Sequence, residues 1–243
     1  FARAGSVIGA LLGSAIVVVF GIRWTMSLMA IPYLSSFLIG ITLSEPPGKA
    51  AKARTGYWRL MFGGIKYIVS HKILRTLILD MAMVTGLCFL VIWIYQPLLQ
   101  QLGLPLAYFG IIHALISIGQ IAVATNFARL EKIAGSKKRY LTFSVLFPAL
   151  LFIFLSFNSN VFLAAIAIVA IPSFGMSRYT LMLSYLQKYI QSENRATVIS
   201  AVSMLFKIIL AAAYLCIGVT VGISTSLTLL GIGMMLVALS IYS

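Results

Sequence analysis

Two side chains of opposite charge stand inside stretches of sequence that are otherwise apolar. Asp80 lies five residues beyond Arg75, and Arg178 lies ten residues before Lys188. A helical rise of about 1.5 Å per residue puts Asp80 roughly 7–8 Å, and Arg178 roughly 15 Å, beyond these basic flanks. Ionisable groups at such a depth in an apolar segment are costly, so they are the first functional candidates.

The chemistry available to this acid and this arginine is ion pairing or proton exchange. A nearby arginine favours the charged carboxylate, and its departure favours protonation. We therefore hypothesise that Asp80 pairs with Arg178 or exchanges protons, changing partners between two states. A static ion pair, or an Asp80 held among lipid headgroups, remains the alternative.

Further polar candidates occupy the same kind of segment. His113 and Gln120 share a helix face, where they could bind a solute or, for His113, titrate near neutral pH. A hydrogen-bonded packing role is equally open. Lys207 falls near the middle of its segment, either facing a cavity or extending its amine toward the interface. Tyr185 lies seven residues from Arg178 on one face.

These candidates contain more bases than acids, so either the substrate carries negative charge or acids elsewhere balance the site. Paired carboxylates for Mg²⁺, closely spaced His and Glu for zinc, and a glycine-rich phosphate loop are all missing from the sequence. We expect no metal, no cofactor and no enzyme activity. Cys88 and Cys216 fit packed thiols better than a disulfide.

The elements that carry these residues are eight long apolar segments. The chain has 243 residues, of which 61% are hydrophobic and 9% charged. A bilayer crossing needs about 20 apolar residues. The predicted spans are 4–22, 24–43, 73–97, 106–128, 140–157, 161–187, 196–217 and 223–243.

Lys and Arg collect in alternate gaps, namely 44–75, 129–139 and 188–195, while the other gaps hold only Arg23. Basic loops stay in the cytoplasm, which places both ends of these eight spans inside. The net charge of +14 is then topological and favours anionic lipid. We expect no nucleic-acid partner.

The gap 44–72 is the only long one, and it separates two spans from six. Its residues 57–69 place apolar side chains at helical spacing, opposite Arg59 and Lys66. That pattern predicts a helix lying in the inner interface, or a plain basic linker as the alternative. Since the chain starts at Phe1 close to an apolar span, we expect a fragment of a longer protein.

Small residues form ridges on two spans. Gly5, Gly9 and Gly13 share one face of the first span, and Gly110 and Ala114 share one face of the fourth. Such ridges let helix backbones approach closely in lipid. We predict close helix packing at both.

Several passages resemble the major facilitator superfamily. The loop 126–138 is similar to that family's G-x-L-x-D-R-x-G-R-[KR], with Glu131 for the acid and one extra residue before Gly135. The first glycine ridge is similar to the antiporter signature G-x-x-x-G-P-x-x-G-G, with Ala10 in place of proline and Ser14 in place of the last glycine. Residues 95–99 and 193–200 are also similar to bacterial members.

The resemblance implies an all-α integral membrane bundle of twelve helices in two six-helix halves, of which this chain resembles helices five to twelve. Residues 1–43 would end the first half, 44–72 would form the central cytoplasmic loop, and 73–243 would form the second half. The ridges would then meet across the halves, and the helices carrying Asp80 and Arg178 would line the cavity. A gate latch at the inner face would use the loop residues Arg129, Glu131, Lys132, Gly135 and Lys138.

The function implied is a secondary carrier of a small solute, a monomer in the cell membrane, with the bacterial inner membrane as its expected location. Proton-coupled efflux, resembling multidrug export, is the first expectation. Proton- or sodium-coupled uptake of a nutrient or organic anion is the alternative. A channel, a non-transporting bundle or a membrane enzyme represents the other classes.

Overall fold

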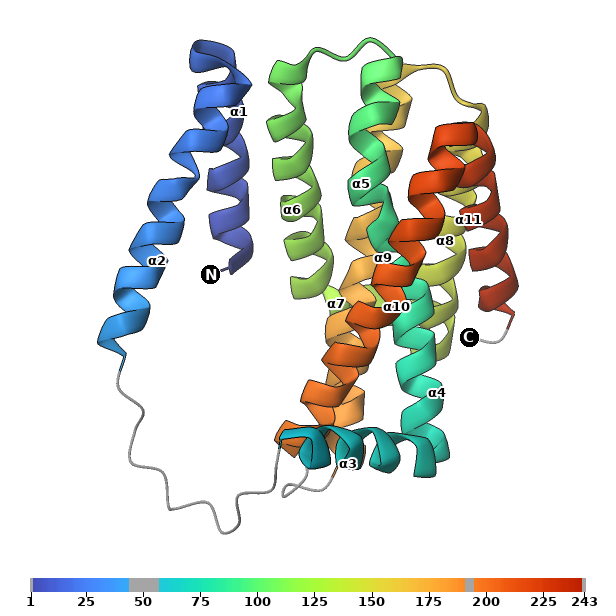
Figure 1. Cartoon of the computed structure of the whole chain (residues 1–243). Coiled ribbons are helices and arrows are strands. Elements are labelled where there is room, and N and C mark those ends of the chain that lie inside the picture. The colour runs from blue at the N-terminus through green and yellow to red at the C-terminus, as the bar shows by residue number, and fades with distance from the viewer. Residues whose placement is uncertain (1, 44–56, 191–194, 242–243) are drawn as a thin grey trace.

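The computed structural model describes residues 2–43, 57–190 and 195–241, and these fold into helices with short connections (Figure 1). The predicted central loop therefore lies partly outside the described residues, as do residues 193 and 194 of the passage 193–200. The long helices run roughly side by side, and one short helix crosses beneath them.

The helices have the following bounds in chain order. They are α1 (Ala2–Leu28), α2 (Ala30–Thr42), α3 (Tyr57–Ser70), α4 (Lys72–Asp80), the π-helix η1 (Met81–Thr85), α5 (Gly86–Gln101), the 3₁₀-helix η2 (Leu106–Tyr108), α6 (Phe109–Thr125), α7 (Phe127–Ala134), α8 (Lys137–Phe157), α9 (Val161–Tyr189), α10 (Arg195–Ile223) and α11 (Thr225–Ser240).

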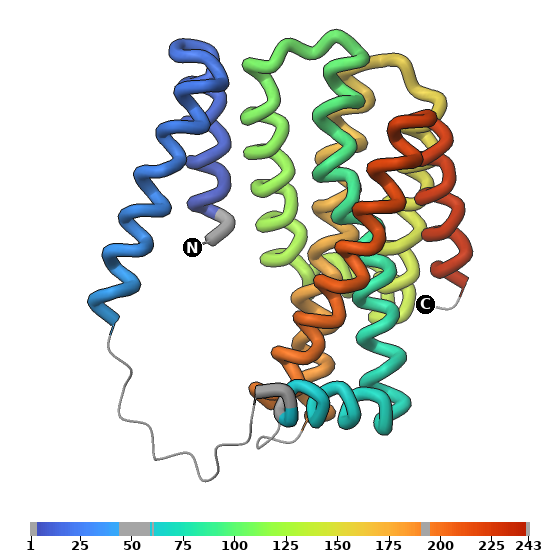
Figure 2. Tube along the Cα trace, viewed as in Figure 1, coloured from blue at the N-terminus to red at the C-terminus, as the bar shows by residue number. Residues whose placement is uncertain are grey.

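Six stretches of the described chain are long and apolar enough to cross a membrane, and α11 is a shorter apolar helix. The first stretch, Ala4–Thr42, is too long for one crossing. Gly21 interrupts it with φ 81° and ψ 167°, a conformation open to glycine, and the chain reverses there. The two legs are seen clearly in the tube of Figure 2. The two legs of this stretch, the other five stretches and the shorter α11 occupy the eight predicted segments, and six stretches have the length and composition of a membrane span.

One predicted boundary differs from the structure. The predicted spans 196–217 and 223–243 leave a longer gap than is found, because α10 continues to Ile223 and only Ser224 separates it from α11. Ser224 caps α11 by accepting from the Leu227 N–H at 3.3 Å. The irregular backbone of the inner half lies in the π-helix Met81–Thr85, whereas α9 runs unbroken through its Pro172.

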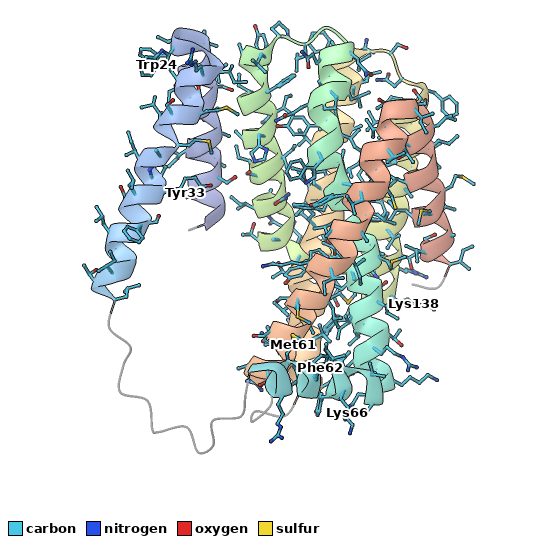
Figure 3. The ribbon with its side chains drawn as sticks, in the orientation of Figure 1. Trp24, Tyr33, Met61, Phe62, Lys66 and Lys138 are labelled. Carbon is cyan, nitrogen blue, oxygen red and sulfur yellow. The ribbon has the colours of Figure 1, made fainter. Side chains whose placement is uncertain are left out.

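The main hydrophobic core lies among α5, α6, α8, α9 and α11, and a second cluster lies at the inner end around α3, α4, α9 and α10. Helix α3 is amphipathic, as predicted over 57–69, and packs across the base of α10. A Cβ on Gly64 would lie 2.9 Å from Ala201 Cβ, so the two helices touch closely here. Lys66 is exposed and points away from the bundle (Figure 3).

Helices α1 and α2 stand to one side of the bundle and keep most of their apolar surface exposed. Trp24 and Tyr33 are 63% and 71% exposed. Their connection to the rest runs mainly through α1 and α6. This interface separates the helix pair from the larger bundle.

Candidate functional site

Asp80 and Arg178 form a bidentate ion pair between the end of α4 and the middle of α9. Arg178 Nη2 donates to both carboxylate oxygens of Asp80 at 2.7 Å, and its Nε donates to Oδ2 at 3.1 Å. Planar fork-to-carboxylate pairing of this kind is the strongest geometry available to an arginine. The two charged candidates that the sequence singled out are thus in direct contact.

A third helix completes the surroundings of Arg178. Its Nη1 donates to the Leu141 carbonyl oxygen at 2.7 Å and to Ser144 Oγ at 3.0 Å, both on α8. The side chain of Arg178 is 2% exposed, whereas that of Asp80 is 23% exposed. The guanidinium is therefore held by Asp80 on one side and by α8 on the other, and the carboxylate is the more exposed partner of the pair.

The local backbone explains why Asp80 can reach Arg178. Asp80 is the last residue of α4, and the chain then passes through the π-helix Met81–Thr85 before α5 begins. A π-turn changes the helical phase of the residues that flank it, and such turns are frequent at functional sites. Opposite it, Gly175 on α9 lets Cys88 Sγ approach the backbone where a Cβ would overlap it.

A cavity of about 320 Å³ lies between α1, α5 and the start of α6. Tyr95, Gln96 and His113 line it, and the same three residues line an adjoining cavity of about 200 Å³. Gln96 Nε2 donates to Tyr95 Oη at 3.2 Å, and the rings of Tyr95 and His113 are 6.4 Å apart. The sequence singled out His113 as a candidate but not Tyr95 or Gln96.

The other polar candidates belong neither to the ion pair of Asp80 and Arg178 nor to the lining of this cavity. Gln120 is buried and donates to Met176 Sδ at 3.3 Å, and Tyr185 lies beneath Lys188, whose Nζ is 5.7 Å from the ring centroid. Lys207 is exposed on α10. His113 and Gln120 therefore share a helix but face different partners.

The basic loop that resembles the family motif forms helix α7, its C-cap and the N-cap of α8. Gly135 has φ 79° and ends α7 in the left-handed conformation, and Ser136 Oγ accepts from the Arg139 N–H at 3.2 Å. Arg129, Lys132 and Lys138 are exposed, and among the described residues Glu131 makes no ion pair. The loop is a capped turn, and the latch stays a prediction.

Small residues bring α1 and α6 together, on a different face of α1 from the one predicted. Ser14 Oγ accepts from the Gly110 N–H at 2.7 Å, and a Cβ on Gly110 would overlap Ser14 Oγ and the Ala10 carbonyl oxygen. About two turns further in, the Ser6 and Ser117 hydroxyl oxygens are 3.3 Å apart.

The predicted glycines do not line this contact. A Cβ on Gly5, Gly9 or Gly13 would meet nothing within 4 Å, and Gly9 and Gly13 border the cavity instead. On α6, Gly110 and Ala114 are buried as expected. The close approach therefore uses the neighbouring serine and alanine face of α1.

Two other features limit the chemistry. A larger cavity of about 500 Å³ between α5, α10 and α11 is lined mainly by aliphatic side chains, which offer little to orient a polar solute. Within the described residues, no group of three or more His, Cys, Asp or Glu side chains could hold a metal ion. Ion pairing, hydrogen bonding and proton exchange are what the two polar groups offer.

The comparisons with known proteins give one match. The sequence model of the Major Facilitator Superfamily matches residues 1–214, which confirms the resemblance drawn from the loop and span pattern. Neither the curated proteins nor the solved structures contain a match.

Proposed function

Since this chain belongs to the Major Facilitator Superfamily, a family of membrane transporters and not of enzymes, we propose that it exports a small, partly apolar solute in exchange for protons. The mechanism is alternating access, in which two helical bodies rock around a site between them. The ion pair between Asp80 and Arg178 is the observation that carries the proposal.

The two bodies are the helix pair 1–43 and the bundle 73–243, joined by the segment 44–72. The α1–α6 interface supports this division, because it is built from Ser6, Ser14, Gly110 and Ser117 with short contacts. Small residues allow two helices to touch and separate without large side chains interlocking. This interface is the surface on which the bodies move.

Proton coupling follows from the different surroundings of the two charges. Arg178 also donates to the Leu141 carbonyl oxygen and to Ser144 Oγ on α8, and it keeps these hydrogen bonds when Asp80 leaves. Asp80 then loses the positive charge of the guanidinium beside it. Removing one member of a buried pair costs about 3–5 kcal/mol if the other stays charged and unsatisfied. The hydrogen bonds from α8 reduce the cost of leaving the Arg178 charge without Asp80. Proton uptake neutralises Asp80 and so removes the cost of leaving its carboxylate charged.

The orientation places the α3 end of the bundle in the cytoplasm. Lys66, Lys72 and Arg75 are exposed at this end, together with the basic loop of α7. Basic residues concentrate on the cytoplasmic side of membrane proteins. Asp80 then belongs to the inner half, and the bacterial inner membrane is the proposed location.

The test uses the full-length protein in proteoliposomes that contain the pH-sensitive dye pyranine. Uncharged, cationic and anionic solutes are added outside in turn, and the lumenal pH is followed. Exchange of solute for protons makes the lumen more alkaline, whereas uptake with protons makes it more acidic. The proposal predicts an alkaline signal that disappears in Asp80→Asn and persists in Lys66→Gln, because the Lys66 side chain is exposed and points away from the bundle.

Two results would contradict the proposal. An acidic signal would replace export with proton-coupled uptake of a nutrient or organic anion. Saturable solute counterflow with no proton signal, or with a pH dependence unchanged in Asp80→Asn, would remove Asp80 from coupling.

A further inference from the structure

The cavity between α1, α5 and α6 has an uncharged lining, and this limits what it can hold. Its hydrogen-bonding side chains are Tyr95, Gln96, His113, Ser14 and Thr25. The remaining described lining residues are aliphatic, aromatic or glycine, and none is Asp, Glu, Lys or Arg. The ion pair on α4 and α9 does not contribute to it.

The polar groups of this cavity have hydrogen-bonding capacity left over. Gln96 uses one amide hydrogen on Tyr95 Oη, which leaves its carbonyl oxygen and second hydrogen without a protein partner among the described residues. His113 has no hydrogen bond within the described chain, and its ring centroid lies 6.4 Å from that of Tyr95. Together these groups offer both donors and acceptors beside an aromatic surface.

We propose that this cavity is the cargo site and that it takes an uncharged solute with hydroxyl or amide groups on one side and an apolar face on the other. The inference rests on the proposed carrier function and names its substrate class. Gln96, Tyr95 and His113 hydrogen-bond the polar side of the solute. Phe109 and Leu106 contact its apolar face.

Charge is the basis of this selection. Transferring an ion into a membrane-embedded site without an opposite charge is costly. A neutral solute that satisfies the free donors and acceptors avoids this cost. Size adds a second limit, because 320 Å³ lies near the lower end of small-molecule pockets.

The position of the cavity suits a transported solute. α1 belongs to one proposed body, and α5 and α6 belong to the other, so both bodies touch the occupant. The hydrogen bond from the Gly110 N–H to Ser14 Oγ borders the cavity at 2.7 Å. Separation of α1 from α6 therefore opens the site along this edge.

The test measures the charge preference of the cavity with thiol reagents, independently of transport. The variant Gly13→Cys is made in the full-length protein with Cys216→Ser, because a Cβ at Gly13 meets nothing within 4 Å and Gly13 lines the cavity. Buried Cys88 is retained. Membrane vesicles are treated with hydroxyethyl, trimethylammonioethyl and sulfonatoethyl methanethiosulfonate. Each rate is divided by the rate at exposed Gln101→Cys, which corrects for intrinsic reactivity.

The neutral hydroxyethyl reagent should label the introduced thiol at a normalised rate about tenfold or more above both charged reagents, as a difference of about 1.4 kcal/mol requires. Preferential labelling by the sulfonate would indicate an anion site with a protonated His113, and preferential labelling by the ammonium reagent would indicate a cation site. Either result, or no labelling by any reagent, overturns the inference. Loss of proton coupling in Asp80→Asn would leave this labelling pattern intact, so the two proposals fail separately.

Discussion

Gly110 is the point where α6 approaches the α1 backbone most closely, and adding one methyl group there should push the two helices apart. A Cβ on Gly110 would overlap Ser14 Oγ and the Ala10 carbonyl oxygen and would lie 2.7 Å from Ser14 Cβ. The Ala10 oxygen and Ser14 Cβ cannot rotate away. Gly110→Ala must therefore move α1 as a whole, or distort one of the two helices.

The magnitude follows from two contributions. Overpacking a tight contact costs about 1–3 kcal/mol. Loss of the 2.7 Å hydrogen bond from the Gly110 N–H to Ser14 Oγ adds about 0.6 kcal/mol, the average for hydrogen bonds between membrane helices, and at most about 1.7. A sum of roughly 2–4 kcal/mol lowers the equilibrium constant of the closed contact between about 30-fold and several hundred-fold.

The assay is disulfide cross-linking between Ser6→Cys and Ser117→Cys, whose native hydroxyl oxygens are 3.3 Å apart. Side chains this close are within reach of disulfide geometry after small adjustments. Cys216→Ser removes the exposed native thiol. We expect the cross-linking rate to fall by about tenfold or more in Gly110→Ala, as a shift above 1.4 kcal/mol requires.

Gly13→Ala is the matched control, because its Cβ would meet nothing within 4 Å. It should cross-link as fast as the parent. Ser14→Ala, which removes the hydrogen bond and keeps the contact, should fall between the two. Equal rates in Gly110→Ala and the parent would show that the α1–α6 contact does not depend on this close approach.

Three further predictions concern stability in detergent. Asp80→Leu alone should lower the free energy of unfolding by about 3–5 kcal/mol, because it leaves the buried charge of Arg178 uncompensated. Adding Arg178→Met removes that charge and should restore most of the lost stability. A double variant as unstable as the single one would refute this. Gly175→Ala should destabilise the bundle by about 1–3 kcal/mol because its Cβ would overlap Cys88 Sγ, and Cys88→Ala should suppress the effect when combined with it. Gly64→Val should release α3 from α10 and make α3 sensitive to trypsin, whereas the same change at the preceding glycine, whose Cβ meets nothing, should not.

The crossings and the ion pair could be predicted from sequence because both depend on local signals. Apolar runs of about 20 residues and the basic gaps between them define the spans. Asp80 and Arg178 are conspicuous because charges are so rare within such runs, and the helical rise sets their depth. The other partners of Arg178 were not predictable. Leu141 and Ser144 lie more than 30 residues away on α8, and no spacing rule tells which helices are neighbours.

The packing face of α1 shows a different limit. Gly5, Gly9 and Gly13 repeat every four residues, and so do Ser6, Ala10 and Ser14, one position further along. One residue corresponds to a rotation of about 100° around the helix. Both faces consist of small residues, so the pattern predicts close packing without telling which face meets α6. The choice depends on how α1 is rotated against its neighbour, which only the three-dimensional structure defines.

The proposed coupling pair and the proposed cargo site lie on one continuous helical element at different depths. Asp80 and Tyr95 are 15 residues apart along α4, η1 and α5, or about 22 Å at helical rise. The π-helix Met81–Thr85 stands between them, next to Asp80. A return of this segment to α-helical geometry would rotate Tyr95 and Gln96 relative to Asp80, because the π-turn holds one extra residue. Departure of Arg178 from Asp80 and a change in the cargo site can therefore be one event, even though the charge never enters the uncharged cavity.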